Sequence, residues 1–290
     1  MVGVLTMPPG GSVRRPAATP LQLRKKIKMN TNNTLQLVNE QGWQRGLRNL
    51  LRAEMGGWWQ TRSWWIQTLI WVSVVNMSIA SAIWGSSEDA PAAIALYALF
   101  ACLFPTIAII IILQDAIIGE KESGTAAWVL SKPVSRTAFV VAKLIAHSVG
   151  VLVTMTLLPG LVAYLQLSLA GDTWLNPLTF LGGMGIAWLY QMFFLTLTLM
   201  LGVLFAQRAA VIGIPLALAF GTQLLIGAVP ALQYVLPWRL AVGIENETLS
   251  VIESVILGQA PFSWWPVVSV AGCVVVFTAV AIHQFRKEEF

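Results

Sequence analysis

Residues 92–113 read AAIALYALFACLFPTIAIIIIL and contain no charged side chain. A helix crosses the hydrocarbon core of a bilayer with about 20 consecutive apolar residues, so this stretch is predicted to span a membrane. The composition of the whole chain supports that class of protein. Of its 290 residues, 57% are hydrophobic and 11% are charged, whereas a soluble domain has roughly 25% charged residues. A soluble protein with so few charges could not cover its surface, and an integral membrane protein is therefore predicted.

Five further apolar stretches meet the same criterion. Trp64 and Trp65 flank the first, and Trp264 and Trp265 precede the last, as expected for aromatic side chains at the membrane–water boundary. The predicted fold class is all-α and integral to the membrane. Six transmembrane helices lie in a domain of residues 41–290, with short helices in the last outer loop. The five further predicted spans are residues 64–84, 144–164, 180–205, 209–229 and 266–285.

The segment before this domain, residues 1–40, is predicted to be a disordered basic extension. Residues 1–39 contain six Lys or Arg residues and four Pro residues but no acidic residue. Translation from Met29 would place residues 1–28 upstream of the protein, and a transit peptide is the rival interpretation. Whether residues 1–28 belong to the mature protein stays open at this point.

Residues 41–58 are predicted to form an amphipathic helix, because apolar side chains recur at helical spacing and charged ones take the other face. A basic amphipathic helix that leads into a hydrophobic span is expected to lie in the membrane interface as an elbow helix. An ordinary surface helix is the alternative. The apolar face consists of Trp43, Leu47, Leu50, Leu51, Met55 and Trp58, and the charged face of Arg45, Arg48, Arg52 and Glu54.

The basic residues predict the orientation. With six spans and a cytoplasmic amino terminus, 17 of the 18 Lys and Arg residues lie on the cytoplasmic side, and only Arg239 lies outside. This asymmetry follows the positive-inside rule. Both termini and residues 114–136 are therefore predicted to be cytoplasmic, residues 230–265 are predicted to be outside, and the plasma membrane is the expected location. The net charge of +5 is explained in this way, so no nucleic-acid partner is needed.

Sequence patterns of catalysis are missing. The chain has no GxxxxGK[ST] phosphate loop, no HExxH, no GxSxG and no CxxC. Its two cysteines, Cys102 and Cys273, lie within apolar runs and give no metal-ligand spacing. We therefore predict that this chain has no catalytic residue, no metal site and no cofactor. It is not expected to be an enzyme.

Four polar residues within the spans are candidates for a transport pathway: Asn76, His147, Gln191 and Gln223. Hydrogen bonds between helices are the alternative for each of them. Lys143 is expected to reach the membrane surface from the mouth of the third span. No Asp, Glu, Lys or Arg lies deep in any predicted span, so energy for transport would come from elsewhere. Small residues at four-residue spacing favour close helix packing, within one subunit or in a dimer: Gly183 and Ala187, and Gly213, Ala217 and Gly221.

Residues 114–136, QDAIIGEKESGTAAWVLSKPVSR, form a charged island between apolar runs. A short helix is predicted from Glu120 to Ser131, because acidic residues suit its first turn and Pro133 disfavours helical geometry at the residue before it. The sequence EKESGTAAWVLSKPVSRTAFVVAKLIAH, residues 120–147, resembles the E-x-E-x-G-T…LLS-x-P-V-S-R…GK segment of ABC-2 type ABC transporter permeases. Ala142 departs from the glycine that this family often has before the lysine.

The resemblance implies that residues 120–131 are a coupling helix that docks on a separate ATP-binding subunit, which carries ATP and Mg²⁺. It implies contacts from Glu120, Glu122, Gly124 and Thr125, to which we add the apolar side chains of Trp128 and Leu130. The chain would then be the permease subunit of an ATP-driven exporter, paired with a second permease subunit in a homodimer or heterodimer. The alternative is a non-transporting membrane anchor or assembly factor that keeps the permease fold. An intramembrane enzyme is disfavoured, because His147 is the only candidate group. The sequence does not identify the transported substrate.

Overall fold

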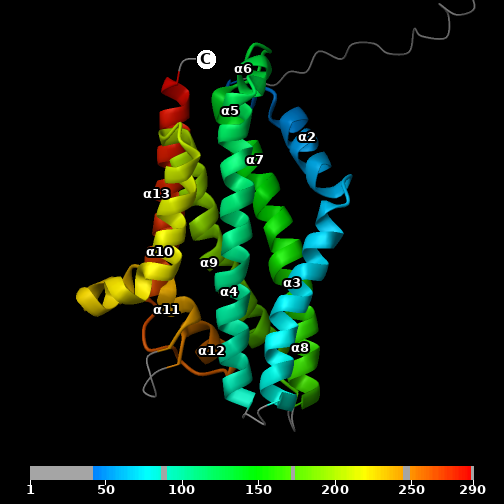
Figure 1. The fold of residues 1–290 in the computed structure, drawn as a ribbon, viewed down its shortest axis with the longest axis vertical. Coiled ribbons are helices and arrows are strands. Elements are labelled where there is room, and N and C mark those ends of the chain that lie inside the picture. The colour runs from blue at the N-terminus through cyan, green and yellow to red at the C-terminus, as the bar shows by residue number, and fades with distance from the viewer. Residues whose placement is uncertain (1–41, 86–89, 171–173, 244–248, 289–290) are drawn as a thin grey trace, which may run out of the picture. The chain divides into compact units, whose positions relative to one another are not determined.

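The computed structural model describes residues 42–85, 90–170, 174–243 and 249–288, and within these ranges it contains helices and no strand (Figure 1). The prediction of an all-α fold is confirmed. The predicted basic extension of residues 1–40 lies outside the described residues. Six helical segments are long and apolar enough to cross a membrane, as predicted: Ser63–Gly85, Pro91–Glu122, Arg136–Ala170, Pro177–Leu204, Arg208–Ala228 and Trp265–Lys287.

The described chain contains long helices of 13 to 28 residues and short helical turns between some of them. Three of the elements, η2, η3 and η4, are π-helical turns that continue a preceding helix. The elements are η1 (Gly42–Gln44), α2 (Leu47–Trp59), α3 (Ser63–Ala80), η2 (Ser81–Gly85), α4 (Ala90–Gln114), η3 (Asp115–Gly119), α5 (Glu120–Glu122), α6 (Thr125–Leu130), α7 (Arg136–Val151), η4 (Leu152–Leu157), α8 (Leu158–Ala170), α9 (Pro177–Leu204), α10 (Arg208–Ala228), η5 (Pro230–Tyr234), α11 (Trp238–Ala241), α12 (Val251–Ile256) and α13 (Trp265–Lys287).

Helix α9 is the centre of the packing, with α4, α13 and α12 as its main neighbours. Its buried aromatic side chains explain this position, because Phe193 packs edge-on against Phe277 of α13, with ring centroids 5.4 Å apart. Burying such rings contributes much of the stability of a helix contact. In Figure 1, α5 and α6 lie at one end of the bundle, near the carboxyl end of α13, and α11 and α12 lie at the other. We call the first of these the coupling end.

The helices run further than the apolar stretches. The second predicted span ends at residue 113, but helical structure continues through η3 into α5, and the third long helix begins at Arg136 rather than at residue 144. Backbone hydrogen bonds continue a helix regardless of whether its side chains are apolar. Most of the predicted loop of residues 114–136 is therefore helical.

Helix α2 packs along α7 with the apolar face that the sequence indicated. Leu50, Leu51, Met55 and Trp58 join one hydrophobic cluster with α7, whereas Trp43 belongs to η1 and is exposed. The contact is close because Gly150 of α7 has no side chain. A Cβ atom at Gly150 would lie 2.5 Å from two ring carbons of Trp58. The position of α2 in a membrane interface stays a prediction.

The segment between α10 and α13 packs back onto the bundle. Helix α12 begins with a capping box, in which the Ser250 hydroxyl accepts from the backbone N–H of Glu253 and the Glu253 carboxylate accepts from that of Ser250. Ile256 of α12 lies against Gly183 of α9, so this small residue serves packing within the chain. Arg239 of α11 is buried, its Nη1 donates to the Val242 carbonyl at 2.9 Å, and burial lowers the pKa of its guanidinium.

Candidate coupling site

The charged island folds as two short helices and not as the single helix predicted for residues 120–131. α5 ends at Glu122, and α6 begins at Thr125 after Gly124, whose φ of 72° lies in the left-handed region. Glycine reaches this conformation without a steric penalty, whereas other L-residues are strained there. Ser135 then caps α7 by accepting a hydrogen bond from the Ala138 backbone N–H at 3.0 Å. The chain therefore turns twice within a few residues, which places α6 as a separate unit at the coupling end.

Replacing Gly124 by alanine is expected to loosen this turn. The strain of a left-handed alanine is about 1 kcal/mol, which corresponds to about fivefold faster amide exchange by local opening. Hydrogen–deuterium exchange over residues 120–130 measures this. Asparagine tolerates the conformation better, so Gly124→Asn should show a smaller increase. Gly57→Ala, at a helical position where a Cβ meets nothing within 4 Å, is the control. Unchanged exchange in Gly124→Ala would contradict the role given to this glycine.

The two faces of α6 differ. Ala126 is buried, and Val129 and Leu130 pack inward against the cluster that includes Phe139 of α7. Trp128 points outward with 63% of its surface exposed, and the Lys132 ammonium group lies 3.4 Å from its ring centroid. Of the predicted contact residues, Gly124, Thr125 and Trp128 are thus on the exposed surface, whereas Leu130 is half-buried and faces the bundle.

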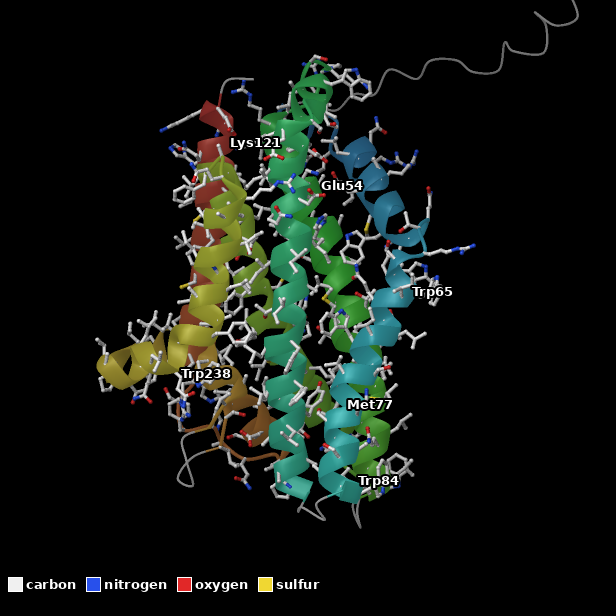
Figure 2. The ribbon with its side chains drawn as sticks, viewed as in Figure 1. Glu54, Trp65, Met77, Trp84, Lys121 and Trp238 are labelled. Carbon is white, nitrogen blue, oxygen red and sulfur yellow. The ribbon has the colours of Figure 1, made fainter. Side chains whose placement is uncertain are left out.

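Glu120 is held from inside the chain by Lys143. The Lys143 Nζ lies 2.6 Å from the Glu120 Oε1 and 2.7 Å from the Glu54 Oε1. Figure 2 shows Glu54 on α2, in the half of the bundle toward the coupling end. Lys143 is only 1% exposed, so the expectation that it reaches the membrane surface is wrong. Because α7 begins at Arg136, Lys143 is about two turns inside the helix, and the two carboxylates neutralise it there.

The next two side chains of α5 are held by other helices. The Lys121 Nζ donates to the carbonyls of Gly202 and Val203 at 3.2 and 3.1 Å, at the carboxyl end of α9. The negative end of the helix dipole favours a cation at this position. Lys121 also pairs with Glu288, just after α13, at 2.7 Å. Glu122 pairs with Arg208, the first residue of α10, at 2.7 Å.

Three consecutive side chains therefore connect α5 to five other elements. Glu120 joins it to α7 and, through Lys143, to Glu54 of α2. Lys121 joins it to the end of α9 and to Glu288 just after α13, and Glu122 joins it to α10. Successive residues of a helix point about 100° apart, which is why neighbours in sequence reach different neighbours in space. In the two Lys143 pairs the lysine is buried and both carboxylates are only partly exposed, so these pairs contribute the most to stability. The exposed Glu122–Arg208 pair contributes little to stability, but it holds α5 in one orientation relative to α10.

A polar pocket of about 480 Å³ lies beside these ion pairs and is lined by Glu54, Glu120, Lys143, His147, Asp115 and Arg208, among others. Within the described ranges, no three His, Cys, Asp or Glu residues are arranged to hold a metal ion. The pocket places the ionised groups next to water at the coupling end. Relative movement of α2, α5 and α7 would change its shape.

The structure does not bring the four predicted pathway residues together. Gln191 bridges helices, since its Nε2 donates to the Ala101 carbonyl at 2.9 Å and its Oε1 accepts from Thr156. The Asn76 Nδ2 donates to the Pro159 carbonyl at 3.3 Å. His147 accepts a long 3.5 Å hydrogen bond from the Trp58 Nε1. Gln223 is exposed and lines a separate pocket near Arg239. Gln191, Asn76 and His147 thus form hydrogen bonds between helices.

Sequence reasoning missed Glu54, Lys121 and Arg208 as partners in this site. The signal was present, because Glu54 is the only acidic residue between residues 41 and 87, and Arg208 is the only charged residue between the fourth and fifth spans. A single charge beside a membrane span needs a partner or water. The identity of each partner depends on which helices lie side by side, which the spacing of charges along the chain does not show.

A comparison with protein-family models agrees with the family that residues 120–147 resemble. The model described as ABC-2 family transporter protein matches residues 22–290, which includes all of the described chain. A comparison with curated proteins finds no match.

Proposed function

Because the chain belongs to the ABC-2 transporter family, we propose that it is the membrane-spanning subunit of an ATP-driven exporter and receives motion from a separate ATP-binding subunit through α6. The observation that carries the proposal is the exposed Trp128 of α6, which directly follows α5, a helix that ion pairs and hydrogen bonds connect to five other elements. Tryptophan is enriched among the side chains that carry most of the binding energy of protein interfaces. ATP and Mg²⁺ would be bound by the partner, since the chain has no phosphate-loop motif.

The same proposal includes the orientation of the chain in the membrane. The coupling end carries Lys121, Lys132, Arg136, Arg208 and Arg286, whereas Arg239 lies at the other end of the bundle. This distribution supports a cytoplasmic coupling end with both termini inside, in the plasma membrane. A second permease subunit would complete the transport path. At Gly213, which is exposed, and at Gly221, which is half-buried, a Cβ meets nothing within 4 Å, so this face of α10 is open to a close neighbour.

Transmission through α6 requires a contact with two arrangements. When ATP brings two ATPase subunits together, each would displace α6, and α5 would carry the displacement into α2, α7, α9, α10 and α13. The spans would then open toward the opposite side of the membrane. Export as the direction rests on the resemblance of residues 120–147 to ABC-2 permeases.

The test uses Trp128→Ala in the complex with its ATPase, reconstituted in vesicles. Trp174→Ala is the matched control, because Trp174 is 64% exposed but precedes α9 at the other end of the bundle. Loss of an interface tryptophan costs about 2 kcal/mol or more, so Trp128→Ala should weaken association about thirtyfold and abolish stimulated ATP hydrolysis. Equal behaviour of the two variants would overturn the assignment of α6. A complex that associates and hydrolyses ATP but moves no cargo would favour the membrane anchor.

A further inference from the structure

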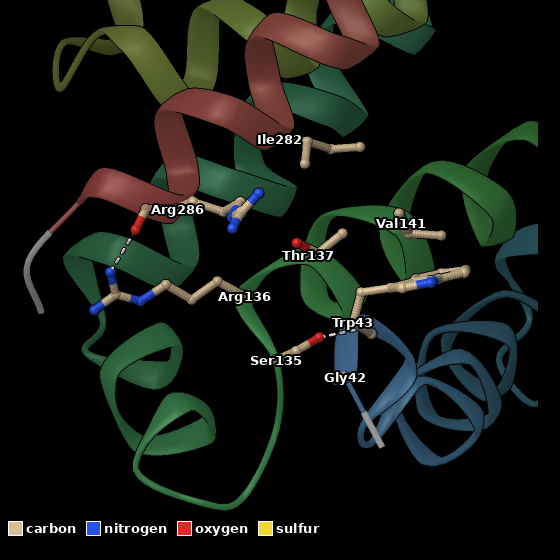
Figure 3. Close-up of a pocket in the computed structure, with 8 residues that line it drawn as sticks. All are labelled: Gly42, Trp43, Ser135, Arg136, Thr137, Val141, Ile282 and Arg286. Carbon is tan, nitrogen blue, oxygen red and sulfur yellow. Dashed lines mark hydrogen bonds between the residues drawn. The ribbon is translucent and has the colours of Figure 1, made fainter. Parts of the chain in front are cut away.

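A second pocket, of about 820 Å³, lies at the coupling end where η1, the start of α7 and the end of α13 meet (Figure 3). Its wall includes two arginines, one from each of the long helices, and three apolar or aromatic side chains. Two of the helical segments that are long and apolar enough to cross a membrane begin at Arg136 and end at Lys287, so the pocket is expected at the boundary between membrane and water. The residues that matter are Trp43, Arg136, Thr137, Val141, Ile282 and Arg286.

The two arginines have no acidic partner among the described residues. The Arg136 Nη1 donates to the Arg286 carbonyl at 2.8 Å, which places its charge at the negative end of α13 and fixes its position. The Arg286 side chain extends from α13 toward Thr137 (Figure 3). The nearby carboxylates of Glu54, Glu120, Glu122 and Glu288 are already paired with Lys143, Arg208 and Lys121. Counting the described residues alone, two positive charges therefore line the pocket without an acidic partner.

The remaining wall is apolar and leads toward the bilayer. The Ser135 hydroxyl donates to the Trp43 carbonyl, and the Ser135 N–H donates to the Arg45 carbonyl at 3.0 Å, which holds η1 beside α7. Val141 is followed one turn later on the same face of α7 by the exposed Ile145. Two turns before Ile282, the exposed Val275 lies on the same face of α13. An apolar stripe thus continues from the pocket along both helices.

We propose that this pocket binds the phosphate headgroup of an anionic phospholipid, with an acyl chain along the stripe of Val141, Ile145, Ile282 and Val275. Guanidinium groups bind phosphate oxygens with paired hydrogen bonds, and basic pockets between transmembrane helices bind such headgroups. A free phosphate ion would use the arginines but would leave the apolar stripe without a role. The bound lipid would bridge η1, α7 and α13, and its binding does not depend on the proposed coupling to an ATPase.

Native mass spectrometry of the full chain in detergent tests the proposal with phosphatidylglycerol and phosphatidylcholine as probes. The chain should bind phosphatidylglycerol more tightly. Each of the two arginines that line the pocket should contribute about a fivefold preference for an anionic lipid, because a base beside a lipid headgroup contributes about 1 kcal/mol. Arg286→Gln should therefore lower that affinity about fivefold, and Arg136→Gln with Arg286→Gln about thirtyfold. Arg286→Lys should retain most of it, because it keeps the charge. Arg48→Gln is the matched control, since Arg48 is an exposed base of α2 at the same end and does not line the pocket.

Three results would overturn the proposal. The first is equal affinity for the two lipids, and the second is an unchanged preference in the double variant. The third is displacement of phosphatidylglycerol by inorganic phosphate at similar concentration, which would indicate a site for a free anion. Thermal unfolding of each variant without lipid shows whether the pocket is intact. If the double variant unfolds at a lower temperature than the unchanged chain, the lipid preference of the single variant Arg286→Gln decides whether the proposal stands.

Discussion

Replacement of Lys143 by methionine is expected to lower the stability of the chain by about 3 kcal/mol, because removal of one partner from a buried ion pair leaves the others uncompensated. Lys143 is enclosed, and Glu54 and Glu120 would face each other without the cation between them. Their repulsion would separate α2 from α5. Denaturant unfolding in detergent measures the loss. Lys287→Met, which removes an exposed base from the last turn of α13, should leave stability nearly unchanged.

A compensated variant separates folding from transmission. In Lys143→Met with Glu54→Gln and Glu120→Gln, no charge is left without a partner, so most of the stability should return. The ionic tie between α5 and the two helices would still be missing. We expect this variant to fold and insert but to show at least tenfold lower stimulation of ATP hydrolysis in the complex. Full stimulation in the folded triple variant would mean that Lys143 serves stability alone.

Replacement of Gly150 by alanine is expected to destabilise the contact between α2 and α7 by about 2 kcal/mol, since extra volume in a well-packed site forces its neighbours apart. The added Cβ would lie 2.5 Å from two carbons of the Trp58 ring. The Trp58 ring is buried and is held by its contact with the His147 ring, so a shift would break that contact. Helix α2 would shift and draw Glu54 away from Lys143, so ATPase stimulation should fall together with stability.

The control for this steric reading is Gly185→Ala in α9, where a Cβ meets nothing within 4 Å. Alanine should be neutral or slightly stabilising there, because it favours helix. A double-mutant cycle of Gly150→Ala with Trp58→Ala should show a coupling of about 1 kcal/mol or more, as the smaller side chain removes the clash. Additive effects in that cycle would show that the ring is not the obstacle.

The membrane fold could be predicted from the sequence, and the partners in the coupling site could not. Six spans follow from the length of apolar runs, which the bilayer thickness imposes locally. The Glu120–Lys143 and Glu54–Lys143 pairs join residues 23 and 89 positions apart, so they depend on helix packing. The same holds for Gln191, which could be assigned to a pathway or to a helix contact until its neighbours Ala101 and Thr156 were known.

The break between α5 and α6 was missed for a different reason. The helical run of acidic and apolar residues around Gly124 favours one continuous helix, and a single glycine is tolerated inside a helix at a modest cost. Its positive φ is decided by the packing of Ala126 and Leu130 against the bundle on one side and by the ion pairs of α5 on the other. Trp128 could be singled out from the sequence, because a large aromatic residue in a charged segment needs an explanation.

The π-helical turn η3, between α4 and α5, determines how far α5 is rotated about the helix axis relative to α4. A π turn holds one residue more than an α turn, so the five residues from Asp115 to Gly119 rotate α5 relative to α4 by the arc of one extra position. If the same five residues wound as a regular α-helix, α5 would turn by about 100° relative to α4. Glu120 would then point in the direction that Lys121 takes now, away from Lys143 and toward the carboxyl end of α9. Glu120, Lys121 and Glu122 thus meet partners of opposite charge in only one rotation of α5, and the π-helical winding of η3 determines that rotation.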